Sequence, residues 1–192
     1  FRRVLFRSIG GFNSFIRKQK KLNADSAFLS LYQFDHEYAI TYQNIPIEQV
    51  PELTYETFEP NGQTALLDAI GKTIVNIEQQ KDDSIIIVII TDGEENSSNT
   101  YVSKEQINQM IKQKKDLGWE FVFLGANQDA IHSAGQLGIG DSSALTYDVS
   151  ASQNAFESLS GAISRTRSTP IKEAKKINFT PEERSMSLNL PK

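Results

Sequence analysis

The sequence contains no cysteine and has only two histidines and one tryptophan among its 192 residues. The absence of cysteine excludes a disulfide framework, a thiolate metal ligand, a cysteine nucleophile and redox chemistry at sulfur. His36 and His132 stand far apart without ligand-like spacing, so we expect them at the surface rather than as a metal pair or a catalytic base. A chain without cysteine is compatible with a reducing compartment, and we expect a cytoplasmic protein.

Long hydrophobic runs are also missing. The longest, in SIIIVIITDG (84–93), has six consecutive branched aliphatic residues, which is far too few to cross a bilayer. Apolar residues make up 39% of the chain and charged residues 23%, as in globular proteins. We therefore expect one domain with a sizeable core, a short appendage and no membrane partner.

Charge is distributed unevenly along the chain. Residues 1–21 carry seven basic side chains and no acid, which leaves 13 basic against 24 acidic residues, or −11, in the remainder. The acidic body would repel a phosphate backbone, so we expect no nucleic-acid partner. The basic start lacks the initiator methionine and the cleavage site usual in targeting segments. FRRVLFRS is similar to the translated end of a sequencing adapter, so we expect residues 1–8 to be non-native.

Hydrophobic periodicity predicts strands that alternate with helices. The predicted helices cover 9–21, 64–80, 103–117, 129–137 and 151–167, and the predicted strands cover 27–34, 38–42, the SIIIVIITDG run, 119–125 and 144–147. Residues 45–53, with two prolines, are predicted to be an irregular connection. From residue 169 the chain becomes polar, and 169–192 is predicted to be a flexible, poorly packed tail.

The strand in SIIIVIITDG is apolar at every position of its aliphatic run, which is typical of a strand buried on both faces of a parallel sheet. Alternating strands and helices predict a three-layer α/β/α sandwich with right-handed crossovers. Such sheets bind ligands beyond the carboxyl ends of their strands. The loops that follow the strands are therefore the places to look for function.

Asp92 follows the SIIIVIIT strand directly and is followed by Gly93. A carboxylate held at a strand end by rigid backbone suits a hard cation such as Mg²⁺, which prefers oxygen ligands. The same two residues could instead simply form a turn. The local motif leaves both interpretations open.

Thr64 ends the loop P-N-G-Q-T and opens a predicted helix. Its hydroxyl could cap the first turn of that helix, which is the interpretation that the local motif favours. A hydroxyl beside a helix N-terminus could also be a neutral metal ligand. Asn127 and Asp129 also follow a strand, the one near 119–125, and Asp129 is more simply a cap of the next helix than a ligand-facing residue.

The adjacent acids Glu94 and Glu95 could form an acid/base pair, but neighbouring loop acids are more often solvated. GQLGIG at 135–140 imitates a dinucleotide fingerprint without the strand–turn–helix context that the pyrophosphate needs. The sequence thus predicts neither catalytic nor cofactor-binding residues, and we expect no enzyme.

The order of these features resembles the von Willebrand factor type A domain. In that family a metal-ion-dependent adhesion site combines a D-x-S-x-S loop after the first strand, a threonine at a later helix start and an aspartate after the fourth strand. Thr64 and Asp92 match the last two positions. The wider similarity is to a bacterial and phage subgroup of single-domain type A proteins, and is carried by IGGFNSFI, FDHEY, TALLDAI, VIITDGEEN and WEFVFLGAN.

The resemblance implies a Rossmann-like fold over residues 9–168, with a mostly parallel sheet and one antiparallel edge strand. It also implies a non-enzymatic domain that uses Mg²⁺ or Mn²⁺, held by Thr64 and Asp92, to bind the carboxylate of a protein ligand. The rim of this site would be formed by Gly62, Gln63, Gly93, Glu94, Glu95 and Asn96.

The sequence departs from the family because no D-x-S-x-S precedes Ile9. The resemblance therefore predicts that the first, central strand and its metal loop are absent, and that this chain binds Mg²⁺ weakly or not at all. The alternatives are a Mg²⁺-dependent phosphotransfer domain, similar to a phosphatase or a receiver domain, and a scaffold domain that never bound metal.

Overall fold

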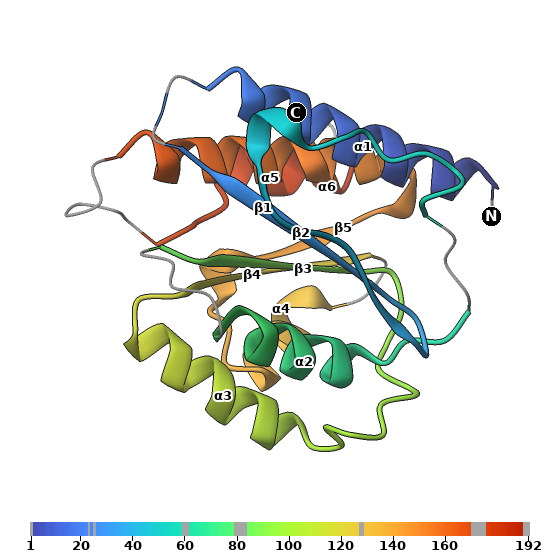
Figure 1. The fold of residues 1–192 in the computed structure, drawn as a ribbon, viewed down its shortest axis with the longest axis vertical. Helices are drawn as coiled ribbons and strands as arrows, with labels where there is room; N and C mark the ends of the chain where they lie inside the picture. Colours follow the sequence, from blue (N-terminus) through green and yellow to red (C-terminus); the bar gives the residue numbers. More distant parts are fainter. Residues whose placement is uncertain are drawn as a thin grey trace.

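The computed structural model describes residues 2–22, 24, 26–58, 62–78, 84–126, 129–169 and 176–189, with side chains from residue 8 onward. Strands occupy the middle layer, with helices on both sides (Figure 1). One outer layer holds α1 (Arg2–Lys20), α5 (Ser152–Arg167) and α6 (Pro181–Ser187). The other holds α2 (Leu66–Glu78), α3 (Lys104–Asp116) and α4 (Ala130–Gln136). The predicted α/β/α sandwich is confirmed.

Three strands form a parallel sheet in the order β3–β4–β5, namely β3 (Ile86–Thr91), β4 (Glu120–Ala126) and β5 (Ala144–Tyr147). Ile86 pairs with Glu120 at one end of β3, and Thr91 pairs with Gly125 at the other. Helices α3 and α4 connect these strands, so the carboxyl ends of all three strands lie at one edge.

The two remaining strands form a separate antiparallel hairpin, β1 (Phe28–Phe34) and β2 (Tyr38–Pro46). The turn between them is held by the Glu37 amide, which donates to the Asp35 carboxylate at 2.6 Å. Strand β2 extends beyond the predicted residue 42 because Ile45 and Pro46 still pair with β1. The strands thus divide into two sheets within the described residues.

Apolar side chains form one cluster on each face of the parallel sheet. Ile87 and Ile89 of β3 are buried against α2 and α3, whereas Val88 and its same-face neighbours Ile86 and Ile90, on the α1 and α5 side, are only half-buried. The prediction that this strand is buried on both faces is therefore correct for one face only.

Helix α1 begins at Arg2, about two turns before the predicted start at Ile9. No proline or glycine stands in residues 2–8, so nothing in their backbone ends the helix there. From Ile9 onward its apolar face packs on α5, with Phe12, Phe15 and Ile16 in the shared cluster.

Residues 176–189, predicted to belong to a flexible tail, are packed against β5 and α5. Thr180 and Glu183 form a reciprocal capping box at the start of α6, and Ile177 and Phe179 are buried. The Arg184 guanidinium donates to the carbonyl oxygen of Ala144, the first residue of β5, at 2.8 Å. The sequence pattern missed this segment because its four apolar residues, Ile177, Phe179, Met186 and Leu188, do not recur with a helical or strand period.

Candidate functional site

The site centres on the carboxyl end of β3 and the segment that enters α2. Gly93 lies directly against Thr64, since a Cβ atom added to Gly93 would come within 2.5 Å of the Thr64 Oγ1 atom. The turn after β3 is closed by Thr91, whose hydroxyl donates to the Gly93 carbonyl oxygen at 2.8 Å. The structure thus brings together the T-D-G and G-Q-T motifs, which lie about 30 residues apart in the sequence.

Asn96 fastens these two segments to each other. The Thr64 amide donates to the Asn96 side-chain oxygen at 2.9 Å, and the Asn96 amide donates to the Thr64 carbonyl oxygen at 3.0 Å. Two hydrogen bonds between the same pair of residues fix both distance and orientation. Asn96, predicted as part of the rim, therefore also holds Thr64 in place.

Glu95 caps the start of α2 from the facing loop. Its carboxylate accepts from the amides of Leu67 at 2.9 Å and Ser98 at 2.8 Å, and from the Ser98 hydroxyl at 2.7 Å. Burial would raise the pKa of Glu95, but these donors outweigh it and hold the pKa below its ordinary value. Glu95, predicted as a rim residue, is thus an ionised part of the framework.

The Asp68 amide, also in the first turn of α2, donates to the Ser98 hydroxyl at 3.0 Å. Among the described residues, two amides in the first turn of α2 therefore donate to side chains of the facing loop, Leu67 to Glu95 and Asp68 to Ser98. These side chains supply the cap that the local motif assigned to Thr64. The Thr64 hydroxyl instead points at Gly93.

Asp68 fixes the far end of the same loop, a role that the sequence analysis missed. Its buried carboxylate accepts from the amides of Tyr101 at 2.7 Å and Thr100 at 2.9 Å and pairs with Lys72 at 3.2 Å. Burial would raise the pKa of Asp68, but the two amides and the ammonium group lower it overall. An acid within the otherwise apolar ALLDAI turn was the pattern that could have revealed it.

The remaining predicted residues form the open part of the site. Gly62, Gln63, Asp92 and Glu94 are exposed. The negative charge of Asp92 also acts on Tyr147, the last residue of β5. Burial mainly, and the negative charge of Asp92 in addition, raise the pKa of Tyr147. Tyr147 is a neighbour of the site that the strand pattern alone did not single out.

The other residues considered in the sequence analysis lie outside this site or outside the described part of the chain. Asp129 caps α4, since its carboxylate accepts from the His132 amide at 3.0 Å, and the capping interpretation is confirmed. Asn127 lies outside the described residues. His36 and His132 are both exposed, as predicted.

Thr64 and Asp92 supply two oxygen atoms of the kind that Mg²⁺ and Mn²⁺ prefer. Within the described residues, no group of three or more histidine, aspartate or glutamate side chains could hold a metal ion. An octahedral ion needs more ligands than these two residues offer. The residues present therefore do not fit a complete metal centre, and Glu95 cannot contribute because one of its oxygens accepts from the Leu67 amide of α2 and the other from the loop amides of Ser97 and Ser98.

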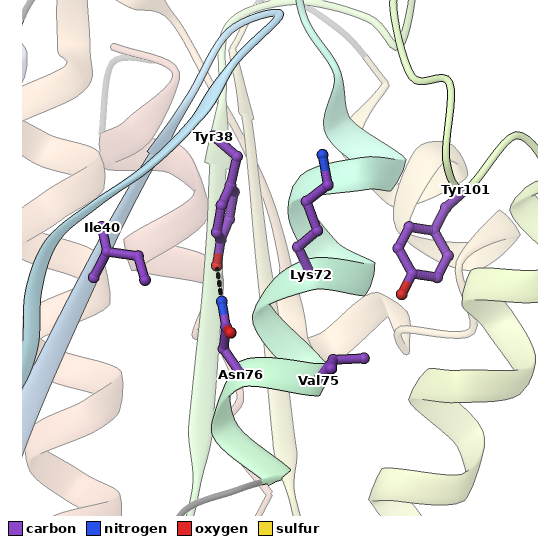
Figure 2. Close-up of a pocket in the computed structure, with 6 residues that line it drawn as sticks. All are labelled: Tyr38, Ile40, Lys72, Val75, Asn76 and Tyr101. Carbon is purple, nitrogen blue, oxygen red and sulfur yellow. Dashed lines mark hydrogen bonds between the residues drawn. The ribbon is translucent and has the colours of Figure 1, made fainter.

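A small pocket of about 330 Å³ lies beside α2, away from its N-terminus (Figure 2). Tyr38 and Asn76 point toward each other across it, and the Asn76 amide donates to the Tyr38 hydroxyl at 3.2 Å. Burial raises the pKa of Tyr38, against the opposing effect of hydrogen bonds from Thr73 and Asn76. This pocket is shallow and separate from Thr64 and Asp92.

No protein-family model matches this sequence, and no curated protein matches it significantly. Among solved structures, the chain is similar to proximal thread matrix protein 1 from the mussel byssus, with a TM-score of 0.59 at 11% identity. That match covers 80% of this chain and 40% of the mussel chain. A second crystal form of the same protein gives a TM-score of 0.57 at 13% identity, over 82% and 40% of the two chains.

These likenesses concern the fold, and the chain spans about two fifths of the length of the mussel protein. The fold is α/β, a Rossmann-like sandwich of the von Willebrand factor type A kind, with its strands divided between two sheets. None of the helices in the described part of the chain is long and apolar enough to cross a membrane.

Proposed function

We propose that this chain is a non-enzymatic, protein-binding domain of the von Willebrand factor type A family, from its bacterial and phage single-domain subgroup. The observation that carries the proposal is the contact of Gly93 with the Thr64 hydroxyl at the carboxyl edge of the parallel sheet. Ligands of α/β sheets bind at this edge. The exposed Gly62, Gln63, Asp92 and Glu94 would form the surface that meets the partner.

The framework around this surface supports binding rather than turnover. Asn96, Glu95 and Asp68 use their polar atoms to hold the loops, so the exposed residues are presented by a fixed backbone. Glu95 is also a poor general acid at neutral pH because its pKa is lowered. Similarity to a byssus matrix protein is in keeping with a non-enzymatic role.

Metal dependence is part of the proposal for the family site, with Thr64 and Asp92 as two of the ligands to Mg²⁺ or Mn²⁺. Since these two do not complete a centre, we expect this chain to bind either ion weakly or not at all. Titration calorimetry with both ions should show no tight binding. Tight stoichiometric binding that is lost in Asp92→Ala would contradict an incomplete site.

The partner would be a protein that offers a carboxylate, rather than a nucleic acid or a membrane, and the proposed location is the cytoplasm. To test binding, a random peptide library would be selected on the wild-type chain with Mg²⁺ in large excess, so that even a weakly bound ion occupies the site, and counter-selected on a Thr64→Val/Asp92→Asn variant. We expect acidic peptides that bind the wild type about tenfold more tightly than the variant. Peptides that bind both equally would refute a site at this edge.

A metal-independent scaffold is the second candidate, favoured by the incomplete ligand set and the matrix-protein likeness. A metal site raises the midpoint of thermal unfolding as Mg²⁺ is added, and a scaffold shows no shift. The phosphotransfer alternative has weaker support, because Lys72, the first lysine after Thr64 in the chain, is paired with Asp68.

A further inference from the structure

Strand β2 has one edge that no strand covers. Within the described residues it pairs only with β1, so its second edge lacks a strand partner. Edge strands of proteins commonly carry charged residues, which discourage pairing with another chain. The residues of β2, YAITYQNIP, include no charged side chain. Strand β2 therefore has the composition of a strand that can accept a further strand.

The backbone limits how far this edge extends. Asn44 adopts a φ of 51°, outside the extended region, and Pro46 has no amide to donate. Residues 38–43 remain in the strand, and Ala39 and Ile40 among them are exposed. The part of β2 that is suited to pairing is therefore 38–43.

The pocket of about 330 Å³ lies beside this edge, between β2 and α2 (Figure 2). Its lining includes Tyr38 and Ile40 from β2 and Lys72, Val75 and Asn76 from α2. Two of these side chains leave apolar surface open, since Ile40 is 47% exposed and Val75 is 39% exposed. A free strand edge and an apolar pocket thus lie next to each other.

Two tyrosines that line the pocket are held in place by their neighbours. The Tyr38 ring stacks on Tyr32 with ring centroids 5.6 Å apart, and its hydroxyl forms a hydrogen bond with Thr73 at 3.0 Å. The Tyr101 ring lies against Gly71, where an added Cβ atom would come within 2.6 Å of it. The pocket is therefore preformed, which lowers the entropic cost of binding.

Lys72 gives the pocket a positive charge. Its side chain is 39% exposed, and its ammonium group pairs with Asp68 at 3.2 Å. An ammonium group has three N–H donors, so it can bind a second carboxylate as well. The β2 strand of a second copy would bring no acid to Lys72, because β2 has none. The charge therefore favours a segment of another protein that carries an acid.

We propose that the free edge of β2 binds an extended segment of a partner protein, with an apolar residue followed two positions later by an acidic residue. The segment would pair antiparallel to β2, as β1 does. Residues opposite each other in an antiparallel pair lie on the same face. The apolar residue, opposite Ile40, would cover Val75, and the acidic residue, opposite Tyr38, would reach Lys72.

This site goes beyond the proposed function at the carboxyl edge, because it uses other residues and no metal ion. Peptide binding can therefore be measured in EDTA, and on the Thr64→Val/Asp92→Asn variant as well as on the wild type. We expect equal affinity for the two chains, whether or not the carboxyl edge binds a partner. Loss of binding in the variant would assign the peptide to the carboxyl edge and overturn the site on β2.

The probe is the fluorescently labelled peptide TVTVTET, in which the two valines and the glutamate share one face. Fluorescence anisotropy with the full chain should show saturable binding. The peptide TVTVTQT should bind about threefold more weakly, because it lacks the charge. The peptide TVTPTET should bind about tenfold more weakly or worse, because proline disrupts strand pairing. Equal binding of all three peptides, or no binding up to about 1 mM, would overturn the proposal.

Hydrogen exchange locates the bound peptide. The amides of β2 should exchange more slowly in the complex, while those of β3 and β5 should not change. Strand β3 lines a separate cavity of about 1590 Å³ between the two sheets. Protection of β3 without protection of β2 would place the peptide in that cavity and refute the site on β2.

A pair of variants tests the apolar part of the pocket. Val75→Glu places a carboxylate beside the bound segment and should weaken binding of TVTVTET about tenfold. Ile131→Glu is the matched control, because Ile131 is also a helix residue that is 39% exposed, and it does not line the pocket. Its affinity should stay near that of the wild type. Equal loss in both variants would refute the site.

A third variant tests the charge. Lys72→Met should bind TVTVTET and TVTVTQT equally, since the group that distinguishes them is gone. Lys112→Met, which removes an exposed lysine of α3, should keep the preference for the acidic peptide. A merely structural role of Lys72 would weaken both peptides and leave the preference intact, and that result would contradict the proposed contact.

Discussion

Strands β3 and β4 are neighbours in one parallel sheet and are almost equally apolar, yet they differ in burial. Strand β4 is buried from Phe121 to Ala126, whereas β3 alternates between buried and half-buried residues. Strand β4 has a paired strand on each side, and β3 has one among the described residues. A run of aliphatic residues therefore indicates that a strand is suited to burial on both faces. Whether the strand is buried depends on the presence of a neighbouring strand on each side.

The segments after these two strands also differ. The loop after β3 is tied to α2 by Glu95 and Asp68, which together accept from several backbone amides. The segment after β4 leads to α4, where Asp129 accepts from one amide. The strand with the open edge is thus followed by the more firmly held loop.

The largest effect should come from removing the α2 carboxylate that holds the far end of that loop. Asp68→Ala leaves the amides of Thr100 and Tyr101 without their acceptor, and we expect it to lower the free energy of unfolding by about 3 kcal/mol. Asp129→Ala, the matched change after β4, should cost about 1 kcal/mol. Urea unfolding measures both values, and equal losses would remove the distinction between the two loops.

The next effect compares two valines that are paired in register, Val88 of β3 and Val122 of β4. Val122 is fully buried, so Val122→Ala should cost about 2–3 kcal/mol through lost burial and a new cavity. Val88 is half-buried beside an existing cavity, so Val88→Ala should cost less than about 1 kcal/mol. A larger loss for Val88 would show that β3 is packed as tightly as β4.

A smaller effect should appear in acid. The pKa values of Asp68 and Glu95 are lowered in the folded state, so both contribute stability that is present at neutral pH. That stability should be lost as the pH falls below about 4 and the carboxylates take up protons. Urea unfolding at several pH values should show a shallower acid dependence in Asp68→Asn/Glu95→Gln than in the wild type. An unchanged acid dependence would mean that these carboxylates are not preferentially ionised in the folded chain.

The smallest effect should come from the exposed residue at the end of β3. Asp92→Asn should change the free energy of unfolding by less than about 0.5 kcal/mol, as surface substitutions do. It should also lower the pKa of Tyr147, because the negative charge of Asp92 favours the protonated phenol. Alkaline absorbance titration, with Tyr147→Phe to assign the transition, measures this shift. A pKa that rises or does not move would show that Asp92 and Tyr147 do not interact.

Much of the fold could be predicted from local patterns. The strand at 144–147 has the predicted bounds, and the capping role of Asp129 involves an amide only three positions away in the sequence. The proximity of Thr64 and Gly93 could be expected from the family resemblance, since periodicity alone does not relate distant loops.

What could not be predicted depends on contacts between distant segments. Glu95 caps a helix that begins about 30 residues earlier, and Asp68 accepts from amides about 30 residues later. Neither partner can be identified from composition or spacing. The half-burial of Val88 likewise depends on what lies beyond the edge of its strand, which no pattern within the strand can show.

The C-terminal segment makes the two edges of the parallel sheet unequal. Arg184 binds the carbonyl oxygen of Ala144 at the start of β5, and the Asp148 amide, just past its end, donates to Ser187. Helix α6 and its flanks therefore hold both ends of β5, while β3 keeps its edge open. Stacking of copies edge to edge through this sheet would require both sides. Because the β5 side is covered, edge-to-edge stacking of copies through this sheet into a fibre is blocked.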